Sequence, residues 1–147
     1  MKISIIASKF NQTISDKLVA GAKKALEEEG ITQVPINWVP GAFELPLACS
    51  WLVRKYDALI ALGAVIRGET PHFDYVCSVA SQGIADVSKS AEKPIGFGVI
   101  TANTVDQAVA RSADNEENFG FRAAKAALQM LRLKEKIEDS PPLEKGD

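Results

Sequence analysis

The stretch ALIALGAVIRGETPHFDYV, residues Ala58–Val76, passes from an apolar run through a polar turn into a segment with helical spacing. Comparable apolar runs occur at Ile3–Ala7, Val34–Val39 and Ile95–Ile100, and a longer helical pattern follows each of them. Strands that are apolar throughout are typical of a parallel sheet covered by helices on both faces. The sequence therefore predicts the α/β class, as an open three-layer α/β/α sandwich with a four-stranded parallel sheet whose third strand is Ala58–Leu62.

The helices are expected where apolar residues recur every three or four positions. In the first helical segment Ile14, Leu18, Ala22 and Leu26 share one face, and Gly30 is expected to end the segment. The other helices are expected over the ranges Leu45–Leu52, Asp74–Lys89, Thr104–Arg111 and Gly120–Leu133.

The composition limits the kinds of protein that the chain can be. With 147 residues, 46% of them hydrophobic and 24% charged, it fits a single domain over 1–147 that buries about two thirds of its unfolded surface. A net charge of −2 gives no field that would draw the chain to nucleic acid or to an anionic membrane. No apolar run approaches the roughly 18 residues of a membrane span, so a cytoplasmic protein is expected. The polar, proline-containing residues 138–147 are expected to form a disordered tail.

Sequence signatures of several enzyme classes are absent. Cys49 and Cys77 lie far apart without a CxxC spacing, which favours two reduced thiols over a disulfide or a zinc site. There is one histidine, and there is no HExxH, GxxxxGK[ST], GxGxxG or GxSxG motif. Metal hydrolysis, nucleoside triphosphate binding and serine acyl transfer therefore have no support, and neither a metal nor a cofactor is expected. Chemistry that needs substrate orientation, anion binding and one proton carrier remains.

Most glycine, proline and polar residues that helix surfaces do not explain lie directly after the four apolar runs. In a doubly wound sheet, ligands bind in the crevice outside the carboxyl ends of the strands. The four junctions are SKFN (8–11), PGAFELP (40–46), GAVIRGETPH (63–72) and TANT (101–104). We expect the functional site at this edge of the sheet.

The histidine and two arginines at these junctions each admit two interpretations. His72, with Asp74 nearby, is either a proton carrier, because histidine side chains titrate near neutral pH, or a solvated side chain. Arg67 and Arg111 are either surface cations paired with carboxylates such as Asp114 or anion ligands that act with the N–H groups of a helix N-terminus. The residues alone leave both questions open.

Three further residues at the junctions are candidates for ligand binding. Phe10 and Phe43 lie in loops and not in apolar stripes, so stacking on a planar ligand and packing in the core are equally good interpretations. Glu44 lies in the first turn of a predicted helix, where the helix dipole favours a carboxylate whatever its function.

Five segments, in their order and spacing, resemble the 6,7-dimethyl-8-ribityllumazine synthase family: SKFN, VPGAFELP, ALGAVIRGETPHFDYV, PIGFGVITANTVDQAVARS and GFRAAKAALQM. The resemblance extends from about Ile3 to Leu133, and the second and third segments are highly specific. It implies a flavodoxin-like fold and an enzyme of riboflavin biosynthesis. The implied reaction joins 5-amino-6-(D-ribitylamino)uracil to 3,4-dihydroxy-2-butanone 4-phosphate and gives 6,7-dimethyl-8-ribityllumazine, phosphate and water, without a cofactor.

The resemblance also implies roles for individual residues. His72 is the implied catalytic proton carrier. The residues implied to bind the pyrimidine and its ribityl chain are Phe10, Asn11, Ala42, Phe43, Glu44, Ala64, Val65, Ile66 and, from the neighbouring subunit, Phe97. The phosphate is expected to be bound by N–H groups of Glu69 and Thr70 and by the guanidinium of Arg111.

The sequence departs from the family pattern in two places. Phe119 stands before Gly120 where many members have a lysine, which removes a cation expected near the substrates. The chain also begins almost at its first predicted strand, without the N-terminal extension with which many members pair onto a neighbour's sheet.

For assembly, the resemblance implies a homo-oligomer of pentamers, and both a single pentamer and a sixty-subunit shell stay open. Riboflavin synthase is the candidate protein partner. Three other functions stay open: a non-catalytic relative that binds flavin or lumazine, a riboflavin synthase of the archaeal type, and a mainly structural shell protein. The presence of His72 and Arg111 favours the enzyme over the first, and the RGETPH loop with Arg111 favours it over the second.

Overall fold

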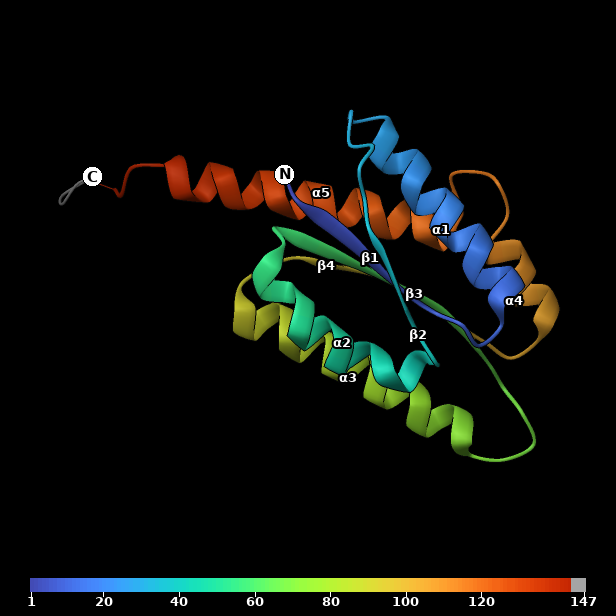
Figure 1. Ribbon diagram of the computed structural model, residues 1–147. Coiled ribbons are helices and arrows are strands. Elements are labelled where there is room, and N and C mark those ends of the chain that lie inside the picture. The colour runs from blue at the N-terminus through green and yellow to red at the C-terminus, as the bar shows by residue number, and fades with distance from the viewer. Residues whose placement is uncertain (144–147) are drawn as a thin grey trace.

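The computed structural model describes residues 1–143 and contains one sheet between two layers of helices (Figure 1). The elements are, in chain order, β1 (Ile3–Ser8), α1 (Gln12–Glu27), β2 (Ile36–Val39), the 3-10 turn η1 (Ala42–Glu44), α2 (Leu45–Leu52), the 3-10 turn η2 (Val53–Lys55), β3 (Ala58–Ile66), α3 (His72–Ala91), β4 (Ile95–Ala102), α4 (Val105–Arg111) and α5 (Phe119–Asp139). The four strands are parallel and lie in the order β2-β1-β3-β4. This order is that of the first four flavodoxin strands, so the predicted flavodoxin-like three-layer fold is confirmed.

Each face of the sheet has its own apolar core. Helices α2 and α3 cover one face, and α1, α4 and α5 cover the other (Figure 1). Leu59 of β3 packs with Leu45 of α2, whereas the next residue, Ile60, packs with Leu18 of α1 and Leu128 of α5. Side chains alternate across a strand, so a fully apolar strand fills both cores. Burial of each of these side chains contributes roughly 1.5–3 kcal/mol.

All four strands differ in length from the prediction: β1 and β4 run one and two residues further, and β2 and β3 differ in ways that affect the site. Strand β2 begins two residues late, after Pro35, because proline has no N–H for the ladder. The Pro35 carbonyl still accepts a hydrogen bond from Ile5 N at 2.9 Å. Strand β3 continues beyond the predicted Leu62 to Ile66, because this segment pairs with β4 as far as Ala102. The longer β3 carries its last residues to the edge where the site was expected.

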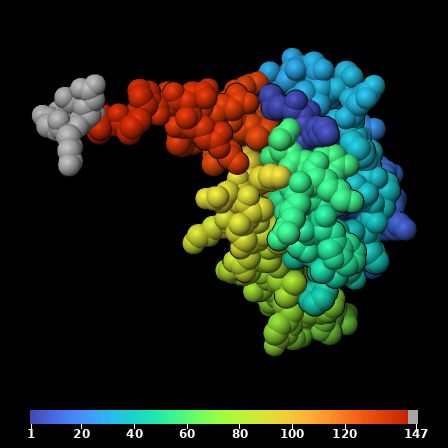
Figure 2. Space-filling view, turned by 60° about the vertical axis from the view of Figure 1, so that its left-hand side comes forward, coloured from blue at the N-terminus to red at the C-terminus, as the bar shows by residue number. Residues whose placement is uncertain are grey.

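Helix α5 lies against β4 and extends past the sheet. Gly96 permits this approach, because a Cβ there would lie 2.3 Å from the carbonyl oxygen of Ala123. The last turns of α5 project from the body of the molecule (Figure 2) and end at Asp139. The helix thus extends two residues into the predicted tail, 138–147, of which residues 144–147 lie outside the described part of the chain.

Candidate functional site

A pocket of about 690 Å³ opens at the carboxyl ends of β1, β2 and β3, beside the first turn of α3. Two other hollows, of about 450 and 260 Å³, lie at the opposite end of the sheet, around Pro94 and Val53. Ligands of doubly wound sheets bind at the carboxyl ends of the strands. The largest of these three hollows is therefore the candidate site.

The structure brings most of the predicted site residues together in this pocket. The predicted residues that line it are Phe10, Ala42, Phe43, Glu44, Ala64, Val65, Ile66, Thr70 and His72. The predicted residues that lie outside its lining are Asn11, Glu69, Phe97 and Arg111. The pocket uses the ends of β1, β2 and β3, whereas Phe97 lies on β4 and Arg111 on α4.

Five lining residues were not predicted from the sequence. They are Pro40, Gly41, Gly68, Phe73 and Val76. The first three lie inside the quoted junctions. Phe73 and Val76 are three residues apart on the buried side of α3, a spacing that predicts core packing. Their location in the first turns of a helix that starts at a strand end was the only available signal.

Phe10 is presented to the pocket by a hydrogen-bonded turn. Its backbone N–H donates to the Pro40 carbonyl oxygen at 3.1 Å, and its side chain is 71% exposed. Asn11 adopts the left-handed conformation, with φ of 60°, and its Nδ2 donates to the Ala64 carbonyl oxygen at 3.0 Å. Asn11 therefore binds the end of β3, while the Phe10 ring stays free.

The turn between β2 and α2 forms another wall of the pocket. Ala42 is buried, whereas the Phe43 side chain is 56% exposed beside the pocket. Glu44 N donates to the Gly41 carbonyl oxygen at 3.2 Å, which closes the turn before α2. The pocket thus has two exposed aromatic rings, from Phe10 and Phe43, and a carboxylate in its lining.

His72 is the first residue of α3, directly after Pro71 at the N-cap position. Its backbone N–H donates to Thr70 Oγ1 at 3.4 Å, and its side chain lies in the exposed part of the pocket lining. The Asp74 carboxylate accepts from Arg67 Nη2 at 3.4 Å. The imidazole is therefore the titratable group of α3 that the pocket lining includes.

Arg67 is held by three neighbours, two of them in α3 and one directly after β4. Its Nε donates to Asn103 Oδ1 at 2.9 Å, and its guanidinium lies 4.4 Å from the centroid of the Phe73 ring. The third neighbour is Asp74. These contacts favour the interpretation of Arg67 as a paired cation that holds the β3–α3 turn in place, and not as an anion ligand.

Arg111 and Phe97 lie away from the pocket of their own chain. Arg111 ends α4, on the face opposite α3, and its Nη1 donates to the Gln107 carbonyl oxygen at 3.0 Å. Asp114, its candidate partner, instead pairs with Lys24. Phe97 is 43% exposed on the edge strand β4. It lies three residues, or about 10 Å, before the β4 residue that pairs with Ala64. One chain alone therefore does not assemble all predicted site residues.

The start of α5 keeps a positive charge although Phe119 replaces the lysine of many family members. The Phe119 ring packs partly buried against the core between the sheet, α1 and α5. The Arg122 guanidinium lies 5.8 Å from the centroid of this ring. Arg122 thus supplies a cation one helical turn from the altered position.

Neither cysteine is in the pocket lining, and both thiols are free. Burial raises the pKa of Cys49 to about 12, and burial together with the Asp74 charge raises the pKa of Cys77. In a Cys77→Ser variant, we expect Cys49 to resist a thiol reagent at pH 8 until the protein is unfolded, because the thiolate is the reactive form. Absorbance of the released chromophore measures this, and rapid modification of the native protein would contradict it.

Residues 1–143 contain neither a cluster of metal ligands nor a membrane-spanning helix. No three or more His, Cys, Asp or Glu side chains are grouped as a metal ion requires. No helix in this part of the chain combines the length and hydropathy needed to cross a bilayer.

A comparison with protein families agrees with the fold and the pocket. The family described as 6,7-dimethyl-8-ribityllumazine synthase matches residues 1–135, a range that contains all four strands and every residue of the pocket lining. This family comprises transferases of riboflavin biosynthesis. The chain therefore belongs to the 6,7-dimethyl-8-ribityllumazine synthase family.

Proposed function

We propose that the chain condenses 5-amino-6-(D-ribitylamino)uracil with 3,4-dihydroxy-2-butanone 4-phosphate to form 6,7-dimethyl-8-ribityllumazine. The observation that carries this proposal is the pocket at the strand ends, where Phe10, Phe43, Glu44 and His72 share one lining. Two exposed rings suit a planar pyrimidine, and a carboxylate suits the hydroxyl groups of a ribityl chain.

The proposed chemistry uses reactive groups that the substrates supply. The pyrimidine amine adds to the ketone and loses water to give an imine, phosphate leaves, and ring closure releases a second water. Holding the two reactants in register removes on the order of 7–11 kcal/mol of the barrier. His72 moves the protons that these steps require, which adds roughly 10²–10⁴-fold to the rate.

The pyrimidine is proposed to stack on Phe10, with its edge against the backbone of Ala64, Val65 and Ile66. Ala42, Phe43 and Glu44 hold the ribityl chain. Asn11 contributes through its bond to the end of β3. The role of each of these residues follows from its place beside the pocket and from the family to which the chain belongs.

The phosphate is proposed to lie at the start of α3. Backbone N–H groups of Glu69 and Thr70 and the positive end of the α3 dipole favour an anion there. Arg111 completes this site from a neighbouring subunit, because in its own chain it lies on the other face of the sheet. Phe97 of the same neighbour closes the pyrimidine pocket.

We further propose that the active form is a ring of five chains, either alone or as the unit of a larger shell. A site shared between neighbours requires a head-to-tail interface, which closes into a ring when the rotation permits. Five chains of 15.8 kDa give about 79 kDa.

A direct assay tests the reaction. The purified protein is mixed with the two substrates, and the absorbance of the lumazine product is followed against a sample without protein. Formation of lumazine at an enzymatic rate supports the proposal. Binding of the pyrimidine without any product would instead favour a non-catalytic relative.

Arg111→Ala is expected to weaken use of the phosphorylated ketone by roughly 10–150-fold, because a charge-assisted bond to phosphate contributes about 1.5–3 kcal/mol. Affinity for the pyrimidine is expected to change little. The measurement is kcat/KM for the ketone beside a Kd for the pyrimidine, and Arg54→Ala, an exposed arginine at the opposite end of the sheet, is the control. Equal losses for both substrates would put Arg111 outside the phosphate site.

A further inference from the structure

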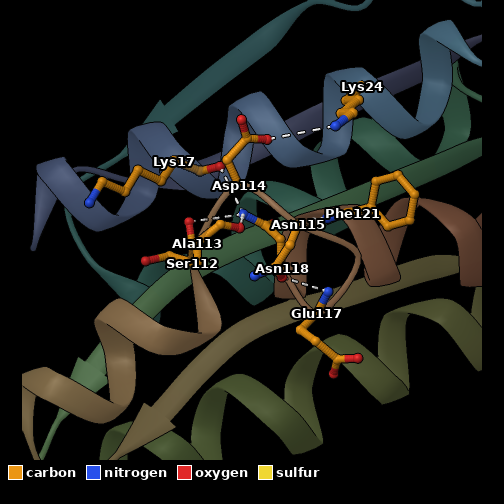
Figure 3. Close-up of polar contacts among 9 residues, drawn as sticks. All are labelled: Lys17, Lys24, Ser112, Ala113, Asp114, Asn115, Glu117, Asn118 and Phe121. Carbon is orange, nitrogen blue, oxygen red and sulfur yellow. Dashed lines mark hydrogen bonds and ion pairs between the residues drawn. The ribbon is translucent and has the colours of Figure 1, made fainter.

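The connection between α4 and α5 is organised around a buried amide, that of Asn118. Its side chain lies between α1, the end of α4 and the start of α5 (Figure 3), and the residue is only 2% exposed. Nδ2 faces the carbonyl oxygens of Lys17, Ser112 and Ala113 at 3.2, 3.0 and 3.1 Å. Oδ1 accepts from the backbone N–H groups of the first turn of α5, Gly120 and Phe121, at 2.8 and 3.0 Å.

This arrangement requires an amide of this size. On one side, the two N–H groups of the amide donate to three carbonyl oxygens. On the other side, the amide oxygen accepts from two backbone N–H groups. Aspartate would set a second oxygen against the three carbonyls, and an apolar residue would leave these buried groups unpaired. The fit to α1 is equally close, because a Cβ on Gly21 would lie 2.2 Å from Asn118 Oδ1.

The amide fixes the carboxyl end of α4 in particular. Ser112 and Ala113 directly follow Arg111, the last residue of this helix, which has seven residues and a single buried side chain, Ala108. The surface contact of the same connection, between Lys24 and Asp114 at 3.7 Å, is exposed and therefore weak. The position of Arg111 thus depends on the hydrogen bonds through which Asn118 links the end of α4 to two long, well-packed helices, α1 and α5.

We infer that Asn118 is a positioning residue for phosphate recognition: it holds Arg111 where the guanidinium can meet the phosphate of the ketone substrate. This inference rests on the proposed function and on the geometry of the α4–α5 connection. It assigns a role in specificity to a side chain that touches no substrate. Loss of the hydrogen bonds from Asn118 to the end of α4 should therefore raise the KM for the phosphorylated ketone and leave pyrimidine binding unchanged.

Asn118→Ser separates this role from a purely structural one. Serine is a preferred N-cap and keeps an acceptor for the first turn of α5, but it has no amide N–H groups to reach Ser112 and Ala113. We expect an oligomer of unchanged mass whose kcat/KM for the ketone falls about tenfold, since a misplacement of about 1 Å can cost up to 10²-fold. Asn115→Ala, an exposed residue of the same connection, is the matched control and should behave as wild type.

A double variant provides the decisive measurement. If Asn118 acts through Arg111, Asn118→Ser should cost nothing further in an Arg111→Ala background, because coupled residues are not additive. Losses that add, or equal losses for the ketone and the pyrimidine, would overturn the inference. If Asn118→Ser does not assemble, the same comparisons are made with Asn118→Gln, which keeps the amide but displaces it.

The inference is also tested without turnover. Calorimetric titration with inorganic phosphate should give a Kd for wild type that rises about tenfold in Asn118→Ser and binding that is lost in Arg111→Ala. An unchanged phosphate Kd in folded Asn118→Ser would overturn the inference even if wild type forms lumazine. Conversely, if no lumazine forms but the phosphate Kd values of wild type and the two variants are as expected, the proposed reaction is wrong and the positioning role of Asn118 is supported.

Discussion

His72→Asn is expected to lower kcat for lumazine formation by about 10²–10⁴-fold, the contribution of a well-placed acid–base group. Substrate affinity should change little, because the hydrogen bond from position 72 to Thr70 is made by the backbone N–H, which asparagine keeps. The exposed position of the side chain also makes loss of stability small. Steady-state rates and pyrimidine titration on the same sample measure both quantities.

The pH dependence of the rate distinguishes proton transfer from simple positioning by His72. The kcat of wild type is expected to depend on pH, and the variant is expected to lose this dependence. Asp86→Asn, on the part of α3 far from the pocket, is the control and should keep the wild-type profile. If kcat of His72→Asn equals that of wild type at every pH, another group or water moves the proton.

Co-assembly of His72→Asn chains with Arg111→Ala chains is expected to restore activity that neither variant has alone. If His72 and Arg111 of one site come from different chains, random assembly in equal amounts leaves about one quarter of the sites with both residues intact. Rates are measured at a ketone concentration far below its KM, where both single variants are slow. Recovery to about a quarter of the wild-type rate is the expected result.

A matched mixture distinguishes a shared site from other causes of recovery. His72→Asn and Glu44→Gln both alter the pocket of their own chain, so co-assembly of these two should restore nothing. Light scattering of each mixture should give the mass of a pentamer or of a multiple of it. A fully active monomer, or a rate equal to the mean of the two separate variants, would contradict the shared site.

The sequence by itself determined the layers of the fold and most of the pocket. Four apolar runs without alternation require a sheet that is buried on both faces, and the helical stripes between them supply the two covers. Parallel strands end at the same edge, so residues as distant as Phe10, Glu44 and His72 could be assigned to one site before any contact was known.

The tertiary structure alone decided which polar side chains are engaged by distant parts of the protein. Arg67 is hydrogen-bonded to Asn103, 36 positions away in the chain. Asn11 is hydrogen-bonded to the end of β3, 53 positions away, and Asn118 is hydrogen-bonded to Lys17, 101 positions away. Hydropathy patterns predict burial, because the periodicity of apolar residues within a single segment indicates which of its side chains face the core. Hydrogen bonds depend on the directions in which distant segments approach each other, and no local pattern encodes those directions.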